Sequence, residues 1–401
     1  MKILHTSDWH IGHTLYNYDR HDEQADMLRQ IKRIAEREKP DVMVVSGDIY
    51  HTPAPSAAAT RLYTESLLSI HQACPSMAIV VTAGNHDSAS RIDSQTQLWR
   101  VAGINVVGGI ARNDDGTARL DDHIVELPCG FVAAVPFAFP SNFPVIVPDE
   151  QTQGIDRQRR FFEALLERVA QRNTASLPVV LMAHLALDGA DVAGNDSIGN
   201  IELMPTDSIG TDYDYAALGH IHHPRTLAGG RARYCGTPIP VSFAEQCSHG
   251  VSIVEVDHHG DMPTIREVPI TNLKPLHTFP ASEPLPLEEI LPQLASLNFK
   301  DSYIRLNVIV DDFLPANARE QAIVKVQEME GGNRFCTFAT TSRAAASTTA
   351  MPELTVEQFR ELQPLDVAQR FFQNRFNREM TDAEIDMFNT ALQAINTQNA
   401  Q

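Results

Sequence analysis

Asp41-Val-Met-Val-Val-Ser-Gly-Asp48 is the stretch of this 401-residue sequence that decides the fold. Its four apolar residues follow one another without alternation, which predicts a parallel strand covered on both faces of an α/β sheet. Ligands bind at the carboxyl edge of such a sheet, and the Gly47 turn lets other groups approach closely. Gly-Asp alone would indicate a helix N-cap. Four other stretches also end in metal-ligand side chains, so we expect Asp48 to lie between them.

Length and composition predict a globular protein of two or three domains, since 43% of the 401 residues are hydrophobic and 21% are charged. The sequence has no run of eighteen apolar residues, so we expect no transmembrane helix. The N-terminus enters a strand pattern directly, without the pattern of a signal peptide. The five cysteines are odd in number and lack C-x-x-C spacing. They predict reduced thiols in a cytoplasmic protein without membrane attachment.

The net charge of −19 weighs against one class of function. A protein that holds nucleic acid on its own surface is usually basic. Bound divalent cations, or a partner with a basic groove, would offset the acidic charge. The charge therefore argues against autonomous DNA binding, but not against phosphodiester chemistry.

Strand and helix patterns alternate along the first two thirds of the chain, which predicts a layered α/β domain with a two-sheet sandwich. The expected strands are 2–7, 42–45, 79–82, 131–135, 179–183, 215–218 and 252–256. The expected helices are 22–38, one beginning after a Ser56 N-cap, and one around 161–166. Basic residues 157–160 precede the last helix and could contact phosphate, although a solvated helix face is the interpretation we favour.

The pattern changes after residue 272. Residues 273–292 carry several prolines and predict a linker. A small unit follows, with a strand at 302–310, a helix at 318–329 and a strand at 334–341, and then a second linker at 344–350. Capping boxes at Thr355 and Thr381 predict two tail helices, the second with an apolar stripe that could pack on its own protein or on a partner. The expected domains are therefore 1–272, 273–345 and 346–401.

Chemistry-bearing side chains gather at the ends of the predicted strands. Asp8 and His10 are two residues apart, as are His220 and His222. On an extended strand this spacing directs both side chains of a pair to the same side. The other candidates each follow a strand: Asp48, the run Asn85-His86-Asp87, and His184.

These candidates offer carboxylate, amide oxygen and imidazole, but no thiolate. That donor set suits Mn²⁺, Fe²⁺ or mixed metals rather than a structural zinc ion. There are too many ligands for one ion. Two ions about 3.5–4 Å apart need a bridging carboxylate, for which Asp48 is the natural candidate.

The motif order D-x-H, G-D, G-N-H-D, H, G-H-x-H resembles that of the calcineurin-like metallophosphoesterases. Five longer stretches around these motifs are similar to one branch of that family, the nuclease subunits that work with an SbcC-type ATPase. These stretches are His5–Gly12, Ser46–His51, Ala83–Ser88, Leu218–His222 and Tyr234–Pro240. The specific motifs all lie within residues 1–240. Beyond about residue 275 the chain resembles these proteins in the order of its parts, a small cap domain followed by partner-binding helices, but not in sequence.

The resemblance implies a four-layer α/β sandwich of two central β-sheets flanked by helices. Residues 1–272 would form this metallophosphoesterase nuclease domain. A small α+β cap of the DNA-recognition kind would follow at 273–345, and residues 346–401 would form a C-terminal helical tail that docks on the ATPase.

The resemblance also implies a role for each site residue. One metal ion would be held by Asp8, His10, Asp48 and His222, and the other by Asp48, Asn85, His184 and His220, with Mn²⁺ the expected ion at both sites. His86 would be free of metal and would act as the general acid that protonates the leaving 3′ oxygen. Asp87 would orient His86. A water molecule acidified by both ions would attack the phosphorus in line. His51 would contact phosphate or support the site. Surface positions are expected for His13, His223, His258 and His259.

The function implied is a DNA repair and recombination nuclease, with double-strand exonuclease and single-strand or hairpin endonuclease activity. It would work with the SbcC-type ATPase as two copies of each subunit, and the chain itself as a homodimer. The first alternative is a stand-alone phosphodiesterase or phosphatase acting on small nucleotides, which the acidic charge favours. The opening motif that contains Trp9 argues against this alternative. So does the long extension after the catalytic domain, which an enzyme for small molecules does not need. The second alternative is a non-catalytic scaffold, which the intact ligand set opposes.

Overall fold

The structure, a computed structural model, describes residues 1–148, 150–190, 203–311 and 313–343, together with scattered single positions from 365 to 388. The chain divides into two compact units. The first comprises residues 1–278, 299–305 and 330–336, and the second comprises 279–298, 306–329 and 337–401. Three strands, β15 (Leu276–Phe279), β16 (Tyr303–Val310) and β17 (Arg334–Ser342), contribute residues to both units, so the domain boundaries expected at 272 and 345 stay predictions.

The first sheet has six strands in the order β14-β13-β1-β4-β5-β6. The strands are β14 (Thr264–Pro269), β13 (Gly250–Glu255), β1 (Lys2–Thr6), β4 (Val42–Ser46), β5 (Ala78–Thr82) and β6 (Ile104–Val107). The last four run parallel to one another, while β13 is antiparallel to both of its neighbours. The carboxyl ends of β1, β4 and β5 therefore meet at one edge of this sheet.

The second sheet also has six strands, in the order β11-β12-β10-β9-β8-β7. They are β11 (Arg225–Leu227), β12 (Ala232–Tyr234), β10 (Tyr215–Gly219), β9 (Val179–His184), β8 (Gly130–Val135) and β7 (Ile124–Leu127). The four inner strands are parallel, and the two edge strands are antiparallel to their neighbours. The sheet thus brings the carboxyl ends of β9 and β10 side by side.

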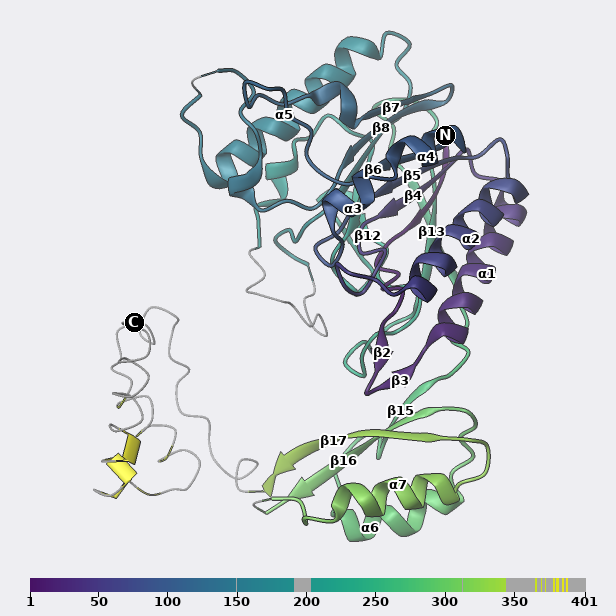
Figure 1. The fold of residues 1–401 in the computed structure, drawn as a ribbon, viewed down its shortest axis with the longest axis vertical. Coiled ribbons are helices and arrows are strands. Elements are labelled where there is room, and N and C mark those ends of the chain that lie inside the picture. The colour runs from purple at the N-terminus through teal and green to yellow at the C-terminus, as the bar shows by residue number, and fades with distance from the viewer. Residues whose placement is uncertain are drawn as a thin grey trace. The chain divides into compact units, whose positions relative to one another are not determined.

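The two sheets pack face to face between layers of helices, as Figure 1 shows. Val42 and Val44 of β4 lie in the core between the sheets, whereas Met43 and Val45 lie in the core beneath the helices. Helices α1 (His21–Glu38), α2 (Ala57–Ala73) and α4 (Thr96–Val101) cover the first sheet, and α5 (Gly154–Arg172) covers the second. Burial on both faces explains the uninterrupted apolar run of β4, and the four layers confirm the expected fold class.

Short elements complete this unit. The N-cap expected at Ser56 is confirmed, because Ala59 N donates to Ser56 Oγ at 3.1 Å. A small hairpin (β2, Thr14–Leu15, and β3, Tyr18–Asp19) and helix α3 (Ala89–Asp93) were not expected from the sequence. Single 3₁₀ turns occur at η1 (Leu120–His123), η2 (Pro140–Asn142), η3 (Thr206–Ile209), η4 (Ala228–Gly230) and η5 (Leu294–Ser296).

Helix α1 begins with a buried network of charged and polar side chains. Arg20 pairs with Glu23 at 2.9 Å, and its other nitrogen donates to the Pro240 carbonyl at 2.6 Å. The Tyr303 hydroxyl donates to the second Glu23 oxygen at 2.8 Å. Both charged side chains are at most 1% exposed. The network therefore ties the start of α1 to residues much later in the first unit.

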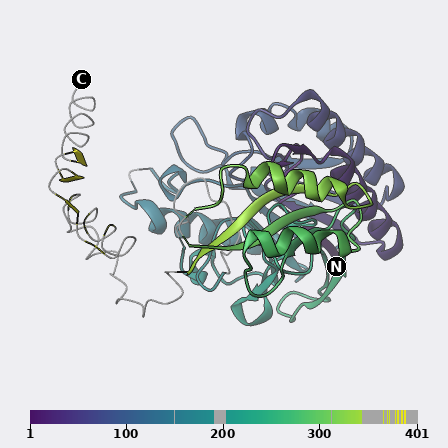
Figure 2. The ribbon, with the colours of Figure 1, turned by 90° about the horizontal axis from the view of Figure 1, so that it is seen from below.

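A three-stranded sheet in the order β15-β16-β17 follows. Its strands are β15 (Leu276–Phe279), β16 (Tyr303–Val310) and β17 (Arg334–Ser342), and helices α6 (Leu287–Gln293) and α7 (Ala318–Glu328) cover one face (Figures 1 and 2). The linker and turn region expected at 273–292 is wrong, because β15 lies within it and α6 begins within it. Its prolines fall both beside and inside the elements: Pro280 follows β15, Pro286 immediately precedes α6, and Pro292 lies within α6.

The described residues include part of the expected tail. Glu384 N donates to Thr381 Oγ1 at 3.4 Å, and Thr381 N donates to Glu384 Oε2 at 2.8 Å, so the second capping box is confirmed. The first capping box at Thr355, the linker at 344–350 and the end of the apolar stripe lie outside the described residues. The two tail helices and their docking role stay predictions. Within the described part of the chain, no helix has the length and apolar character needed to cross a membrane.

Candidate metal centre

The edges of both sheets meet where the predicted ligands gather. Asp8 and His10 follow β1, Asp48 follows β4, Asn85 follows β5, His184 ends β9, and His220 and His222 follow β10. Hydrogen bonds join the two edges directly. His184 Nδ1 donates to the Ser46 carbonyl at 2.7 Å, and Ser46 Oγ donates to the Ala217 carbonyl at 2.9 Å. The sandwich thus brings together residues from distant parts of the chain.

The backbone turns sharply at four of these residues. Asp8, His10, Asp48 and His220 have φ values of 53°, 44°, 50° and 91°. This left-handed region is unfavourable for residues other than glycine and costs about 1–3 kcal/mol for each, and such strain is concentrated at functional sites. The paired ligands were expected to share one side of an extended strand. That explanation is wrong, because β1 ends at Thr6 and β10 at Gly219, and left-handed turns bring the side chains together instead.

Asp8, His10 and His222 form a first cluster, whose ligand atoms lie within 4.8 Å of one another. The Nε2 atoms of His10 and His222 are 3.1 Å apart. Asp48 Oδ2 lies 3.7 Å from His10 Nε2, so it borders the same space. All four residues are buried. These are the four residues that the resemblance assigned to one metal ion.

A second cluster lies on the other side of the Asp48 carboxylate. Asp48 Oδ1 is 3.5 Å from His184 Nε2. Asn85 Oδ1 is 2.9 Å from His184 Nε2 and 2.8 Å from His220 Nδ1. Asp48 therefore directs one carboxylate oxygen toward each cluster, as a bridging ligand would.

Burial and close charges shift the pKa values of this centre in opposite directions. Burial favours neutral Asp48, but His184 and His10 outweigh it and hold the Asp48 pKa below its ordinary value. Burial likewise opposes a charge on His184, but Asp48 raises the His184 pKa to about 9. At His220 burial prevails, reinforced by His184, and the pKa falls to about 3. In Asp8, burial raises the carboxyl pKa.

Two glycines make room for the centre. Gly47 has φ +88°, and a Cβ there would overlap the His184 ring. A Cβ on Gly84 would overlap both the carboxylate and the backbone nitrogen of Asp48. Glycine is therefore required at position 47 for His184 of the second sheet to approach, and at position 84 for the loop after β5 to pack against Asp48 of the same sheet.

The donor set fits divalent cations. Buried carboxylate, imidazole and amide oxygen atoms converge from both sheets, and two Nε2 atoms lie at 3.1 Å. Hard and borderline divalent ions take such ligands. The site is thus a divalent-metal centre, and which residue binds which ion stays a prediction.

His86 and His51 flank the first cluster. Their rings stack with centroids 5.5 Å apart, and together with His10 they form a third group whose ligand atoms lie within 4.8 Å. His86 Nδ1 donates to the His51 carbonyl at 2.9 Å, which leaves Nε2 for proton transfer. The expectation that His86 is free of metal stays a prediction.

Asp87 does not make the expected contact with the His86 ring. Its carboxylate instead accepts hydrogen bonds from the backbone nitrogens of Gly84, Ile49 and Tyr50 at 2.8, 3.0 and 2.9 Å. Asp87 therefore joins the loops that follow β4 and β5. The His51 carbonyl orients the His86 ring.

Of the four histidines expected at the surface, one is exposed and three are half-buried. His258 is exposed, while His223 and His259 are half-buried. His13 is the clearest departure, since its ring lies 4.6 Å from the His51 ring beside the candidate centre. Burial, reinforced by Arg20, lowers the His13 pKa to about 3.

Sequence reasoning missed three residues that hold the site. Glu245 accepts a hydrogen bond from His222 Nδ1 at 3.0 Å. Gln24 of α1 donates to the His10 carbonyl and accepts from Gly12 N, both at 3.0 Å. Phe137 places its ring 6.2–6.3 Å from the rings of His184 and His220. None lies in a ligand motif, so only the fold identifies them.

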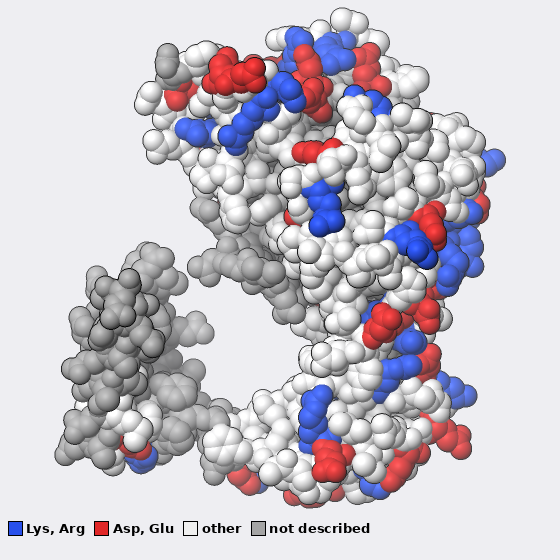
Figure 3. All heavy atoms as spheres, viewed as in Figure 1, with Lys and Arg blue, Asp and Glu red and all other residues white. Residues whose placement is uncertain are grey.

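The basic residues 157–160 belong to α5 itself. Arg159 pairs with Asp156 and Asp207, and Arg160 pairs with Glu163. Gln158, which precedes them, is buried. Figure 3 shows acidic and basic side chains interspersed over the visible face. The cluster is thus an ion-paired helix face, the interpretation we favoured.

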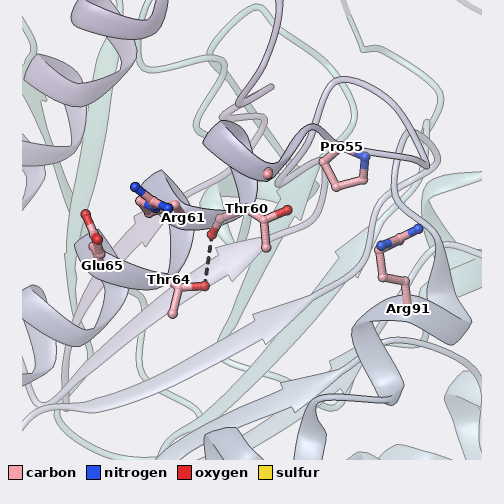
Figure 4. Close-up of a pocket in the computed structure, with 7 residues that line it drawn as sticks. Pro55, Thr60, Arg61, Thr64, Glu65 and Arg91 are labelled. Atoms are coloured by element: carbon pink, nitrogen blue, oxygen red, sulfur yellow. Dashed lines mark hydrogen bonds between the residues drawn. The ribbon is translucent and has the colours of Figure 1, made fainter.

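A shallow hollow of about 560 Å³ lies beside the first turns of α2. Arg61 and Arg91 lie on opposite sides of it in Figure 4. Its lining contains none of the predicted site residues. The hollow is therefore distinct from the ligand clusters.

Two strand-edge clusters of carboxylate and imidazole in a four-layer sandwich define a metal-dependent phosphoester hydrolase. Residues 1–224 match the family described as calcineurin-like phosphoesterases, and the chain belongs to that family. It is 34% identical over 317 residues to SbcD, a component of nuclease SbcCD, from Rhodobacter capsulatus, a match that covers 75% of this chain and 77% of the relative. SbcD proteins are also similar in Escherichia coli K12 (30% identity, 61% and 62% coverage) and Bacillus subtilis 168 (29%, 78% and 80%).

Proposed function

We propose that this chain is the nuclease subunit of a two-component DNA-processing complex. It would cleave phosphodiester bonds in DNA with two divalent ions, Mn²⁺ being the expected metal. The observation that carries the proposal is the Asp48 carboxylate, with one oxygen 3.7 Å from His10 Nε2 and the other 3.5 Å from His184 Nε2. A carboxylate shared between two ligand sets is the feature that a two-metal phosphodiesterase requires.

The residues have distinct proposed tasks. Asp8, His10, Asp48 and His222 would hold one ion, and Asp48, Asn85, His184 and His220 would hold the other. When bound, the ions supply Lewis acidity to the phosphoryl group and acidify water. His86 donates its proton to the leaving 3′ oxygen, because its Nδ1 is held by the His51 carbonyl and Nε2 is available. His51 stacks on His86 and keeps that ring in place.

The relatives and the charge together support a partner. The similar proteins are each described as one component, SbcD, of the nuclease SbcCD. The net charge of −19 leaves the chain poorly suited to hold DNA alone. An SbcC-type ATPase would supply the basic surface, in a cytoplasmic complex of two copies of each subunit used in DNA repair and recombination. The free state of all five cysteines agrees with a reducing compartment.

The test is cleavage of labelled duplex and single-stranded DNA with Mn²⁺, with bis-p-nitrophenyl phosphate as a small diester. We expect His86→Asn to retain the wild-type metal content and to lose about 10²–10⁴-fold in DNA cleavage. His258→Asn is the matched control, because that histidine is exposed and away from any ligand cluster. It should cleave at the wild-type rate.

Two results would count against the proposal. Normal DNA cleavage by His86→Asn would remove the general acid from the mechanism. Hydrolysis of the small diester without DNA cleavage, even with the candidate ATPase added, would favour the stand-alone phosphodiesterase acting on small nucleotides.

A further inference from the structure

Glu245 lies directly behind one of the candidate ligands. Its Oε1 accepts a hydrogen bond from His222 Nδ1 at 3.0 Å. The Glu245 side chain is 0% exposed and that of His222 is 8% exposed. A buried carboxylate needs partners for its oxygens, and His222 Nδ1 is the partner of Oε1.

The other Glu245 oxygen accepts two hydrogen bonds. Oε2 accepts from Thr237 Oγ1 at 2.9 Å and from Val241 N at 3.1 Å. Thr237 and Val241 lie in the segment between β12 and β13 that includes Pro240, whose carbonyl accepts from the buried Arg20. The segment between β12 and β13 therefore holds one carboxylate oxygen of Glu245 without the help of His222.

A fixed acceptor at Nδ1 determines how His222 presents its ring. With the Nδ1 proton donated to Glu245, the Nε2 lone pair is left to face Nε2 of His10 at 3.1 Å. Metal-bound histidines commonly donate their second nitrogen to a carboxylate or carbonyl, which sets the tautomer and the ring orientation. At the second cluster, the Ser46 carbonyl does the same for His184 at 2.7 Å.

We propose that Glu245 is a positioning residue that directs His222 Nε2 into the metal site formed with Asp8 and His10. This inference rests on the proposed two-metal function and assigns the residue that orients one ligand. It predicts a selective effect, because Glu245 touches a ligand of the first cluster and none of those in the second.

Mn²⁺ titration of the full chain, with free ion followed by electron paramagnetic resonance, tests the inference without measuring activity. The wild-type chain should bind two ions. In Glu245→Ala, one affinity should fall about 10–100-fold while the other stays unchanged. Glu267→Gln is the matched control, since this glutamate pairs with Arg233 and its side chain is 58% exposed. It should bind as the wild type does.

Glu245→Gln separates positioning from a purely structural role. The amide keeps a carbonyl oxygen for His222 Nδ1, but its NH₂ group faces the Val241 N–H, so the turn contact is lost. Positioning of His222 predicts metal binding close to wild type in this variant. A role limited to holding the 237–241 turn predicts binding as weak as in Glu245→Ala.

The outcomes are distinct. Two wild-type affinities in Glu245→Ala, or equal losses in the Ala and Gln variants, would overturn the role of Glu245 while leaving the proposed function intact. A wild-type chain that binds no divalent ion would overturn the proposed function itself. Thermal unfolding of the metal-free variants shows that each is folded before it is titrated.

Discussion

His10 and His222, 212 residues apart in the sequence, approach to 3.1 Å between their Nε2 atoms. Both rings are buried, and each belongs to a different sheet edge. Two imidazole lone pairs directed at the same point repel unless a proton or cation lies between them. In the metal-free protein a hydrogen-bonded proton between the two nitrogens meets this requirement, and a bound divalent ion would take its place.

Metal binding should release protons. Asp48 outweighs burial and raises the pKa of His184 to about 9, so this imidazole is charged at pH 7 in the metal-free protein. A metal ion takes the neutral form, so the proton must leave and the apparent affinity must rise with pH up to about 9. Calorimetry of Mn²⁺ binding at pH 7 in two buffers of different ionisation enthalpy should show about one proton or more released. Identical heats in both buffers would contradict this.

Asp48→Asn should lose metal, although the amide has nearly the same shape as the carboxylate that it replaces. The amide cannot offer a negative oxygen to both clusters, so we expect elemental analysis to find less than one ion per chain. Asp122→Asn, in an exposed pair with Arg119, serves as control and should leave the metal content unchanged. Full occupancy of both sites in Asp48→Asn would exclude the bridging role.

Gly84→Ala should disturb the centre without removing any ligand. The new Cβ would overlap the Asp48 carboxylate and backbone, so Asp48 must shift, and metal affinity should fall at least about tenfold. At Gly109 the nearest atom to a new Cβ is the Asp93 carboxylate at 3.2 Å, which can move. Gly109→Ala should therefore bind Mn²⁺ normally. Equal affinities in the two variants would show that the loop adapts.

Asp87→Asn should destabilise the fold. Asp87 accepts from three backbone nitrogens, and the amide would present its own N–H groups to at least one of them. Leaving a buried donor unpaired costs about 1–3 kcal/mol, so we expect the free energy of unfolding to drop by about 2–3 kcal/mol in urea titrations. Asp122→Asn, in its exposed pair with Arg119, should change it by less than about 0.5 kcal/mol. An unchanged stability in Asp87→Asn would show that these contacts contribute little.

The sequence was sufficient to predict the layers and the set of residues that converge. Apolar runs such as Val42–Val45 mark strands buried on both faces, and their ends mark the shared edge. The way the ligands converge was not predictable, because left-handed φ values at Asp8 and His10 depend on bonds from their backbone nitrogens to the Gly47 and Asp48 carbonyls. A two-residue spacing carries no information about such turns.

Residues that support the ligands were also beyond sequence reasoning. Glu245 lies 23 positions after His222, outside every motif. Helix α6 was missed because Pro286 immediately precedes it and Pro292 lies inside it, and a proline within a segment argues against a helix. Asp87 follows His86 directly, yet its carboxylate turns to backbone donors, since several N–H groups are free to bind it at the ends of parallel strands.

The Arg20–Glu23–Tyr303 network limits where this chain can be truncated. The first unit is not a contiguous segment, since it includes residues 299–305 and 330–336 from beyond the end of its last long strand. A chain shortened at residue 272 would remove the Tyr303 hydroxyl and leave a Glu23 oxygen buried without its donor, one residue from the Gln24 side chain that holds the His10 loop. The phosphoesterase part is therefore not an independent contiguous domain. A chimera that combines this part with segments of a relative would have to take α1 and these later segments from the same protein.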